Sequence, residues 1–230
     1  GEYMDASAAA ALRERHRALR GQQQSDALAT RLHRAISWLQ RASADNGDDD
    51  TRFIHLWISL NAVYASDFDF EDSERARAAR FLARVVDADT EGRLHAVLFR
   101  QFPGPIRTLI DNPYVFAPFW RALRDHDPSE RWKERFDASR KAAMTALLEK
   151  RTADLLSIVL DRLYVLRNQL VHGGATWNSQ VNRAQLRDGC AILGALVPTI
   201  LDILLEATGF DDDPIAYPVI PASSATGTRA

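Results

Sequence analysis

A chain of 230 residues with 46% hydrophobic and 26% charged side chains has the composition of a globular protein, long enough for one sizeable domain or two small ones. Its formal net charge of −2 excludes a global attraction to nucleic acid, so any such binding must be local. The single cysteine, Cys190, excludes an intramolecular disulfide and a multi-cysteine metal site, and fits a reducing cytoplasm.

The predicted elements are almost all helices, because apolar residues recur at spacings of three and four and no alternating strand pattern stands between hairpin turns. The first helix is predicted over residues 7–20 and stops at Gly21. The second starts after Ser25 and carries an apolar face made of Leu28, Leu32, Ile36 and Leu39. After a loop at residues 46–50, Thr51 opens a third helix, with a broad apolar face made of Phe53, Leu56, Trp57, Leu60, Val63 and Tyr64.

The second half of the chain continues this pattern. Helices are predicted over residues 73–86 and 90–102, and Pro103-Gly104-Pro105 ends the latter. Residues 103–128 are rich in proline and aromatic side chains, which indicates an insertion or a cap of short helices over the main bundle. Further helices are predicted over three ranges, which are 129–150, 152–172 and 179–208.

These elements predict an all-α protein, an antiparallel up-down helical bundle with additional helices. Residues 1–210 are expected to form a single domain, and residues 211–230, which lack periodicity, a flexible tail. The longest apolar stretch, 191–205, is shorter than a membrane span and carries Asp202. We therefore expect a cytoplasmic protein that does not enter a membrane.

The helix predicted over residues 152–172 has two different faces. On an ideal helix one cluster falls within about 80° and defines the core face, namely Leu156, Val159, Leu163, Leu166 and Leu170. The opposite stripe mixes apolar and polar side chains, namely Asp154, Ile158, Asp161, Val165, Asn168 and His172. Such a second stripe is what a helix at a subunit interface needs.

The end of this helix reads Arg167-Asn168-Gln169-Leu170-Val171-His172, followed by Gly173-Gly174. An arginine, an amide and a histidine supply a phosphate clamp, a positioning group and a proton carrier. The arginine–histidine spacing alone is a weak signal, because Arg121 and His126 repeat it; an amide after the arginine makes it more specific. Asn168 and His172 are about 40° apart on the helix and Arg167 is about 140° from His172, so its side chain must wrap around or the helix must distort.

An ordinary structural interpretation also fits this stretch. Gly173-Gly174 is typical of a helix C-terminus, where arginine and histidine are favoured by the helix dipole and the free carbonyls. In that interpretation Asn168 is a solvated helix residue.

The stretch 167–172 resembles the signature of the HEPN superfamily, and residues 56–64 resemble a helix of Abi- and ApeA-like HEPN proteins. The resemblance implies an antiparallel bundle that dimerises with two such helices facing each other. It also implies a metal-independent endoribonuclease without cofactor, from a toxin–antitoxin, abortive-infection or other antiviral system, with an antitoxin or defence protein as partner. The chain departs from the subgroup whose antitoxin nucleotidylates a tyrosine two residues after the histidine, because Gly174 stands there.

The expected catalytic residues are Arg167, Asn168 and His172. An imidazole changes charge near neutral pH, so His172 is expected to act as general base or acid while the ribose 2′-hydroxyl attacks the phosphorus. Arg167 is expected to stabilise charge on the phosphoryl oxygens, and Asn168 to hold His172 or the phosphate. The alternative is a non-catalytic helical module that binds a nucleotide or a partner protein on the same surface.

Other candidate residues favour structural roles. Cys190 stands among apolar residues at helical spacings, which indicates a core position, and Trp57 and Tyr64 are also predicted to be core. The histidines His16, His33, His55 and His95 have no paired ligand spacing, so no metal site is expected. The arginines of the first two helices, such as Arg13, Arg15 and Arg31, are predicted to form a solvated face and not a phosphate track.

Overall fold

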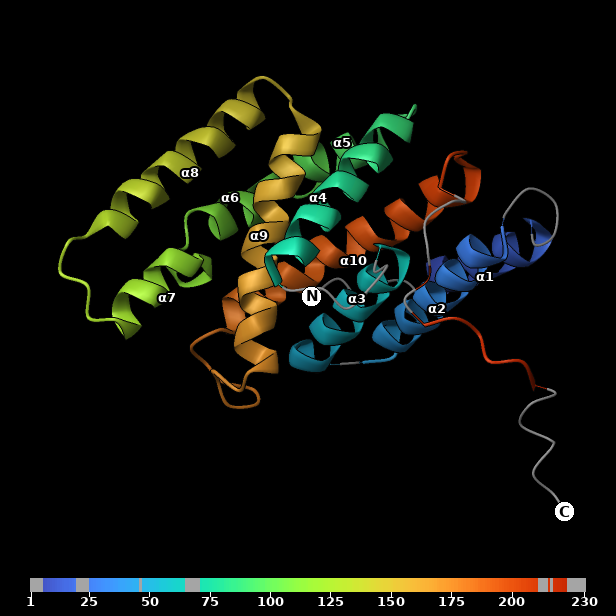
Figure 1. Cartoon of the computed structure of the whole chain (residues 1–230), viewed down its shortest axis with the longest axis horizontal. Coiled ribbons are helices and arrows are strands. Elements are labelled where there is room, and N and C mark those ends of the chain that lie inside the picture. Colours follow the sequence, from blue (N-terminus) through green and yellow to red (C-terminus); the bar gives the residue numbers. More distant parts are fainter. Residues whose placement is uncertain are drawn as a thin grey trace, which may run out of the picture.

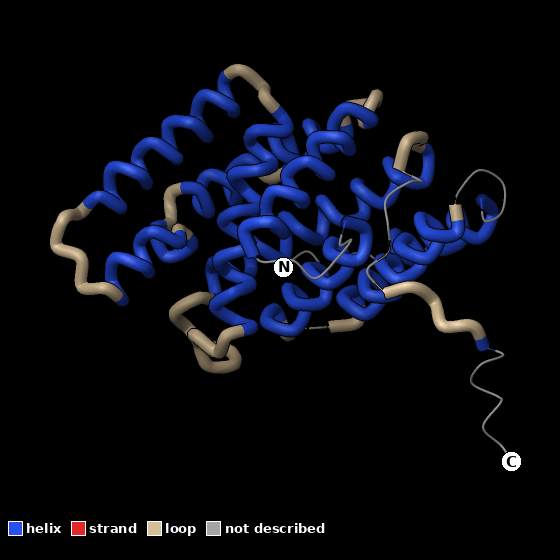
Figure 2. The backbone as a smooth tube through the Cα atoms, viewed as in Figure 1, coloured by secondary structure: helices blue, strands red, loops and turns tan. Residues whose placement is uncertain are grey.

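The computed structural model describes residues 6–19, 25–45, 47–64, 71–210, 215 and 217–222. Every regular element in these residues is a helix, which confirms the predicted all-α class (Figure 2). In chain order they are α1 (Ala6–Leu19), α2 (Asp26–Ser43), α3 (Asp49–Tyr64), α4 (Glu71–Ala88), α5 (Arg93–Ala96), the π-helical η1 (Val97–Gln101), α6 (Pro103–Ile110), the 3₁₀ turn η2 (Pro113–Val115), α7 (Ala117–Arg124), α8 (Arg131–Leu148), α9 (Thr152–Val171) and α10 (Arg183–Glu206).

Local capping explains where several helices begin. Ser25 caps α2 as predicted, since its hydroxyl accepts a hydrogen bond from the Leu28 amide at 3.2 Å. The third helix begins at Asp49, two residues before Thr51, because the Asp48 carboxylate accepts from the Thr51 amide at 3.1 Å. The predicted stop at Gly21 and most of the predicted tail after residue 210 lie outside the described residues.

The region predicted as one helix over 90–102 is divided. Asp89 accepts hydrogen bonds from the amides of Arg93 and Leu94, at 3.0 and 2.8 Å, so the helix begins at Arg93. From Val97 the chain turns into a π-helix, whose last amide, on Phe102, donates to the Val97 carbonyl at 3.1 Å. Pro103 then opens α6 at once, because proline fits the first turn of a helix as well as it ends one.

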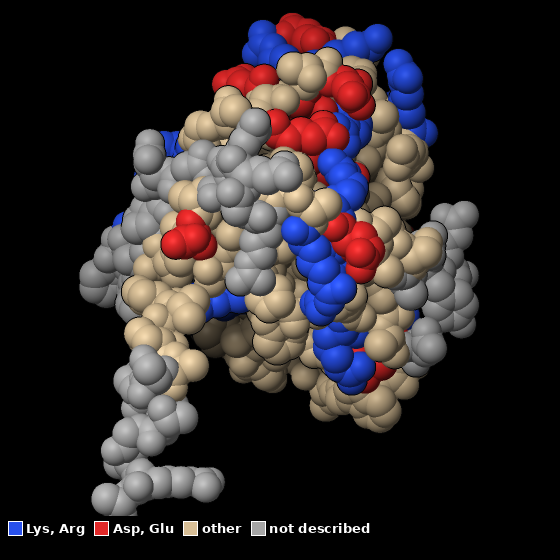
Figure 3. Space-filling model, turned by 90° about the vertical axis from the view of Figure 1, so that its right-hand side faces the viewer, with Lys and Arg blue, Asp and Glu red and all other residues tan. Residues whose placement is uncertain are grey.

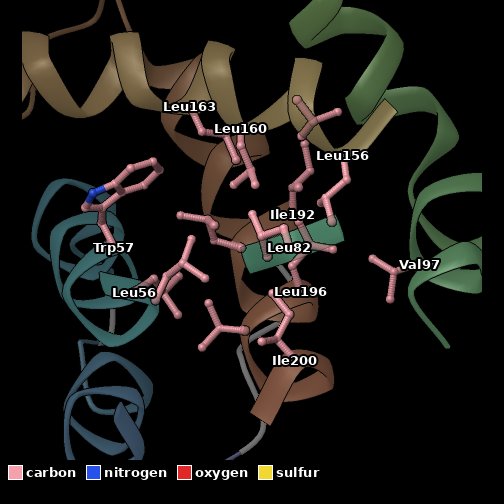
Figure 4. Packing of buried hydrophobic residues seen from close by; sticks show 14 of the residues in the cluster. Leu56, Trp57, Leu82, Val97, Leu156, Leu160, Leu163, Ile192, Leu196 and Ile200 are labelled. Carbon is pink, nitrogen blue, oxygen red and sulfur yellow. The ribbon is translucent and has the colours of Figure 1, made fainter. Parts of the chain in front are cut away.

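The core lies where α2, α3, α9 and α10 meet, with α4 and α6 closing it. Figure 4 shows the interdigitating side chains, among them Leu56, Leu82, Leu156, Leu163, Ile192 and Leu196. The packing is tight where α10 crosses α3 and α9, since a Cβ on Gly189 would stand 2.9 Å from Cε2 of Phe53 and 3.2 Å from Cδ2 of Leu166. Trp57, Tyr64 and Cys190 are buried, as the sequence predicts.

Among the described helices, α10 is long and apolar enough to cross a membrane by length and composition. However, 61% of its most apolar window is buried inside the bundle. Figure 1 shows α10 running through the middle of the molecule, between α9 and the pair α1–α2. Its apolar composition is therefore accounted for by its place in the core.

Residues 103–128 contribute to two different parts of the molecule. Short helices form here, as predicted, but α6 belongs to the core, where it buries Ile106, Leu109 and Ile110. In contrast, α7 has no buried residue and packs against α8 at one end of the molecule (Figure 1). We call the pair α7–α8 the arm.

The arginines near the N-terminus are engaged with other groups of the chain. Arg15 contacts Asp202 and Glu206 of α10, and the buried Arg31 donates to the carbonyls of Val63 and Phe210, both at 2.8 Å. On the side of the molecule shown in Figure 3, basic and acidic side chains alternate along one band. The prediction of a solvated face is therefore wrong for Arg31, whose side chain is buried, and these contacts favour a structural role over a continuous phosphate track.

Candidate functional site

The end of α9 is a complete Schellman motif, which places His172 at the rim of the helix. The His172 amide donates to the Asn168 carbonyl at 2.9 Å, and Gly173 takes the left-handed conformation, with φ of 67°. The amides of Gly173 and Gly174 donate back to the carbonyls of Leu170 and Gln169, at 3.2 and 2.7 Å. The glycines are thus explained by helix termination, and the side chain of His172 is exposed at that end.

Arg167 and Asn168 are in direct contact. Nη1 of Arg167 donates a hydrogen bond to Oδ1 of Asn168 at 2.7 Å. The arginine therefore bends toward the side of the helix that carries Asn168, as the sequence requires if it is to share a site with His172. The structure brings these two side chains together and leaves His172 exposed one turn further along.

The ring of Tyr164, one turn before Asn168, makes cation–π contacts with two arginines. The guanidinium carbon of Arg167 lies 5.5 Å from the centre of the Tyr164 ring, and that of Arg75 on α4 lies 4.3 Å from it. Sequence reasoning missed both Tyr164 and Arg75. The i,i+4 spacing of Tyr164 and Asn168 is a signal that could have found the tyrosine, whereas nothing in the sequence places Arg75 beside α9.

The carboxyl group of Asp161, about one turn before Tyr164, lines the same small cavity as the tyrosine. Desolvation raises the pKa of Asp161 above its ordinary value, and the positive charges of Arg75 and Arg162 oppose that rise. The cavity enclosed between α3, α4 and α9 is about 30 Å³ and is lined partly by Trp57, Tyr164 and Asp161. Such a volume holds about one water molecule, so this cavity is too small for a nucleotide.

The short turn η2, which precedes the arm, contacts α9 within residues 167–172, which we call the motif. Nε2 of Gln169 donates to the carbonyl of Tyr114 in η2 at 2.7 Å. The indole N–H of Trp120 donates to the same carbonyl at 2.7 Å. One backbone oxygen therefore joins α9, η2 and α7.

The loop after His172 is fixed against the start of α3. Asp50 accepts hydrogen bonds from the Asn178 amide at 3.0 Å and from Nη2 of Arg183 at 2.6 Å. Trp177 donates its indole N–H to Asp48 at 3.4 Å, and its ring is 75% exposed. Despite partial desolvation, hydrogen bonds from Thr51 and Trp177 hold the pKa of Asp48 below its ordinary value.

The two faces of α9 differ in solvent exposure. The core face is as predicted for Leu156, Val159, Leu163 and Leu166, which are fully buried, whereas Leu170 is only partly buried against the core. On the opposite stripe Val165 is buried within the chain and Ile158 is half-buried, whereas Asp154, Asp161 and His172 are exposed. The exposed part of this stripe is therefore mainly polar, so the mixed apolar and polar stripe predicted for a subunit interface is present only in part. The exposed apolar side chains at the end of α9 and in the loop after it are Val171, Trp177 and Val181.

The remaining candidates have structural surroundings. Sγ of Cys190 donates to the Asp49 carbonyl at 3.4 Å, and desolvation raises the pKa of its buried thiol, which makes it a poor nucleophile. His126 of the repeated spacing lies in a turn beyond the end of α7. Within the described residues, histidine, cysteine and acidic side chains form no group of three or more that could hold a metal ion.

Comparison with known proteins supplies no relative, since no protein-family model, curated protein or solved structure matches the chain.

Proposed function

We propose that this protein is a metal-independent RNA endonuclease of the HEPN type, with Arg167, Asn168 and His172 as its catalytic residues. The observation that carries the proposal is the 2.7 Å contact between Arg167 and Asn168, one helical turn before an exposed histidine at the end of α9. Two further features support it. Arg75 adds a second positive charge at the Tyr164 ring that Arg167 also contacts, and an exposed site suits a polymer as well as a small molecule.

In the proposed reaction the RNA supplies its own nucleophile. The ribose 2′-hydroxyl gives its proton to a base as its oxygen attacks the phosphorus, and the 5′-oxygen leaves and takes up a proton. The products are a cyclic phosphate and a 5′-hydroxyl end. His172 carries one of these protons, and Arg167 stabilises the negative charge that develops on the phosphoryl oxygens. Asn168, whose oxygen accepts a hydrogen bond from Arg167, is proposed to hold His172 or the phosphate in place.

Two copies are proposed to face each other through the ends of α9, which gives a composite site. The exposed apolar side chains Val171, Trp177 and Val181 lie at the end of α9 and in the loop that follows it, and they suit such a contact. The biological role we propose is the toxic or effector component of a bacterial toxin–antitoxin or antiphage defence system. It would act in the cytoplasm, with a cognate antitoxin or defence protein as partner.

The test is RNA cleavage by the purified, nuclease-free protein, with and without EDTA and with end-group analysis. Loss of general acid–base help costs about 10²- to 10⁴-fold, so His172→Ala should reduce the cleavage rate by that order. His126→Ala is the matched control, because it removes an exposed histidine with the same arginine spacing. Equal cleavage by wild type and His172→Ala would refute the assignment. Loss of cleavage in EDTA with recovery on adding a divalent ion would refute the metal-free mechanism.

A second candidate is a non-catalytic module that binds a nucleotide or a partner protein. It is favoured by the engagement of Arg167 with both Asn168 and Tyr164, since a binding site also needs such a fixed guanidinium. Expression in a bacterial host separates the two. A ribonuclease toxin arrests growth and its Arg167→Ala variant does not, whereas a binding module is harmless in both forms.

A further inference from the structure

Tyr114 and Trp120 lie at the surface and are tied to the motif helix through a single carbonyl. Gln169, the residue directly after Asn168, donates to the Tyr114 carbonyl at 2.7 Å, and the Trp120 indole donates to the same oxygen. The two rings are tilted, with their centres 6.1 Å apart. The aromatic pair is therefore fixed beside the motif even though it belongs to a different segment of the chain.

The position of the pair relative to His172 follows from helix geometry. Looking down α9, His172 lies about 40° from Asn168 on one side and about 60° from Gln169 on the other. The contact between Arg167 and Asn168 is on the first side, and the contact with Tyr114 is on the second. A strand whose phosphate is held on the first side would bring an adjoining nucleotide over the second.

The pair is also built as a supported, exposed surface. Tyr114 is 50% and Trp120 is 39% exposed, while the ring of Phe119 beneath packs edge-on against both, at 5.4 and 5.1 Å. Phe119 in turn packs against Trp132 of α8 at 5.0 Å. Since the indole N–H already donates to the Tyr114 carbonyl, what Trp120 presents to solvent is ring surface.

Core stability does not account for these exposed rings, because α7, which carries Trp120, has no buried residue and the Tyr114 side chain in η2 is half exposed. A nucleobase accounts for them better, since each base has a π-face and stacking on an aromatic ring tolerates any sequence. The exposed Arg121 follows Trp120 directly and provides a positive charge for the backbone.

We propose that Tyr114 and Trp120 form a stacking platform for an unpaired base of single-stranded RNA, next to the phosphate held at Arg167, Asn168 and His172. This inference depends on the proposed function for its choice of ligand. It adds a substrate class, because the bases of a duplex are stacked on one another and cannot reach the platform.

The test measures binding in a His172→Ala background, where RNA stays intact. The probe is a fluorescein-labelled single-stranded RNA of about 12 nucleotides, followed by anisotropy, with the same RNA annealed to its complement for comparison. Tyr114→Ala and Trp120→Ala should each weaken single-strand binding about fivefold or more, and duplex binding much less. Tyr114→Phe and Trp120→Phe keep a ring and should retain most of the affinity. Trp38→Ala is the control, because Trp38 is 38% exposed and lies on α2, across the molecule from the arm.

A second measurement needs no aromatic substitution, so it decides the matter even where an alanine variant unfolds. RNA carrying 5-iodouridine is cross-linked to the His172→Ala protein, and the adduct should map to Tyr114 or Trp120. Unchanged affinity in both alanine variants, or adducts found only elsewhere, would overturn the platform. It would equally be overturned if both variants bound RNA normally but lost self-association on a sizing column, which would make the pair a protein contact.

The two proposals fail separately. Absent cleavage by the wild type, combined with ring-dependent RNA binding, would remove the nuclease and keep the platform. Cleavage that depends on His172, combined with ring-independent binding, would remove the platform and keep the nuclease.

Discussion

The central bundle and the arm are both helical, but different contacts hold them. Helix α10 has buried residues along its length from Leu186 to Leu205, whereas α8, with 18 residues, has only Phe136, Ala143 and Ala146 buried. The arm instead depends on aromatic rings and on a few polar contacts to α9. A part with few buried apolar contacts opens at a lower free energy than the core, so we expect the arm to open before the bundle unfolds.

Arg162 is the main polar link between the two regions. It is 3% exposed, and its Nη2 donates to Ser139 of α8 at 2.9 Å and to the Ile110 carbonyl at 3.4 Å. Its guanidinium carbon also lies 4.7 Å from the ring of Phe116 and 5.5 Å from that of Phe136. Burial lowers the pKa of Arg162 to about 10, so the link is made at an electrostatic cost that Asp161 and Asp111 partly offset.

The largest expected effect on the free energy of unfolding comes from comparing one leucine of the bundle with one leucine of the arm. Leu163→Ala removes a fully buried side chain of α9 and should lower the free energy of unfolding by about 2–5 kcal/mol. Leu148→Ala changes a side chain of α8 that is 76% exposed and should cost about 0.5 kcal/mol or less. Urea unfolding of both variants measures the difference. Similar losses would mean that the arm is as tightly packed as the bundle.

An intermediate effect on stability is expected at Arg162, which links the arm to the bundle. Arg162→Ala removes a charged hydrogen-bond donor and the packing of its stem, which should cost about 2–4 kcal/mol. Hydrogen exchange should show the loss mainly as faster exchange of α8 amides, with α10 amides changed less. Arg162→Met is the control that keeps most of the volume without the charge. Equal acceleration in α8 and α10 would show that the arm does not open on its own.

The smallest effect on stability is expected at Asp161 of α9, on the side of the helix that faces the bundle. Asp161 is exposed at its surface, but partial desolvation by its neighbours raises its pKa, so the folded state holds that proton more tightly than the unfolded state does. The contribution of Asp161 to stability is therefore complete below pH 4 and is lost as pH rises through the raised pKa. Asp161→Asn should therefore stabilise the protein slightly at pH 7 and not at pH 3.5, and the gain should be only about 0.5 kcal/mol or less because solvent screens the exposed carboxylate. Thermal unfolding at the two pH values checks this, and a larger gain at the lower pH would contradict the sign.

Much of the fold follows from periodicity in the sequence. The apolar spacings in α2, α3 and α9 predict their buried faces, and a cap such as Ser25 fixes a helix start. The ends of helices are harder to predict where several neighbouring residues could cap the helix. Asp48, Asp49 and Asp50 each suit a helix start, and Asp48 is chosen because its carboxylate reaches the Thr51 amide. The π-helical turn of η1 has no signature in residue spacing.

The candidate site was predictable only in part. Sequence spacing places Asn168 and His172 one turn apart and shows that Arg167 must bend, but the bond that bends it depends on a rotamer. Contacts between distant segments leave no sequence trace, as Arg75 over Tyr164 and Gln169 with Tyr114 show. Val165 fits an outer stripe by angle, yet it is buried within the chain.

The buried thiol of Cys190 makes the chain convenient for labelling. Cys190 is the only cysteine in the sequence, and its enclosure beside Asp49 keeps the reactive thiolate scarce. A cysteine introduced at the exposed Leu148 would therefore take up a maleimide dye with little background, which gives a direct optical reporter of arm movement on single molecules.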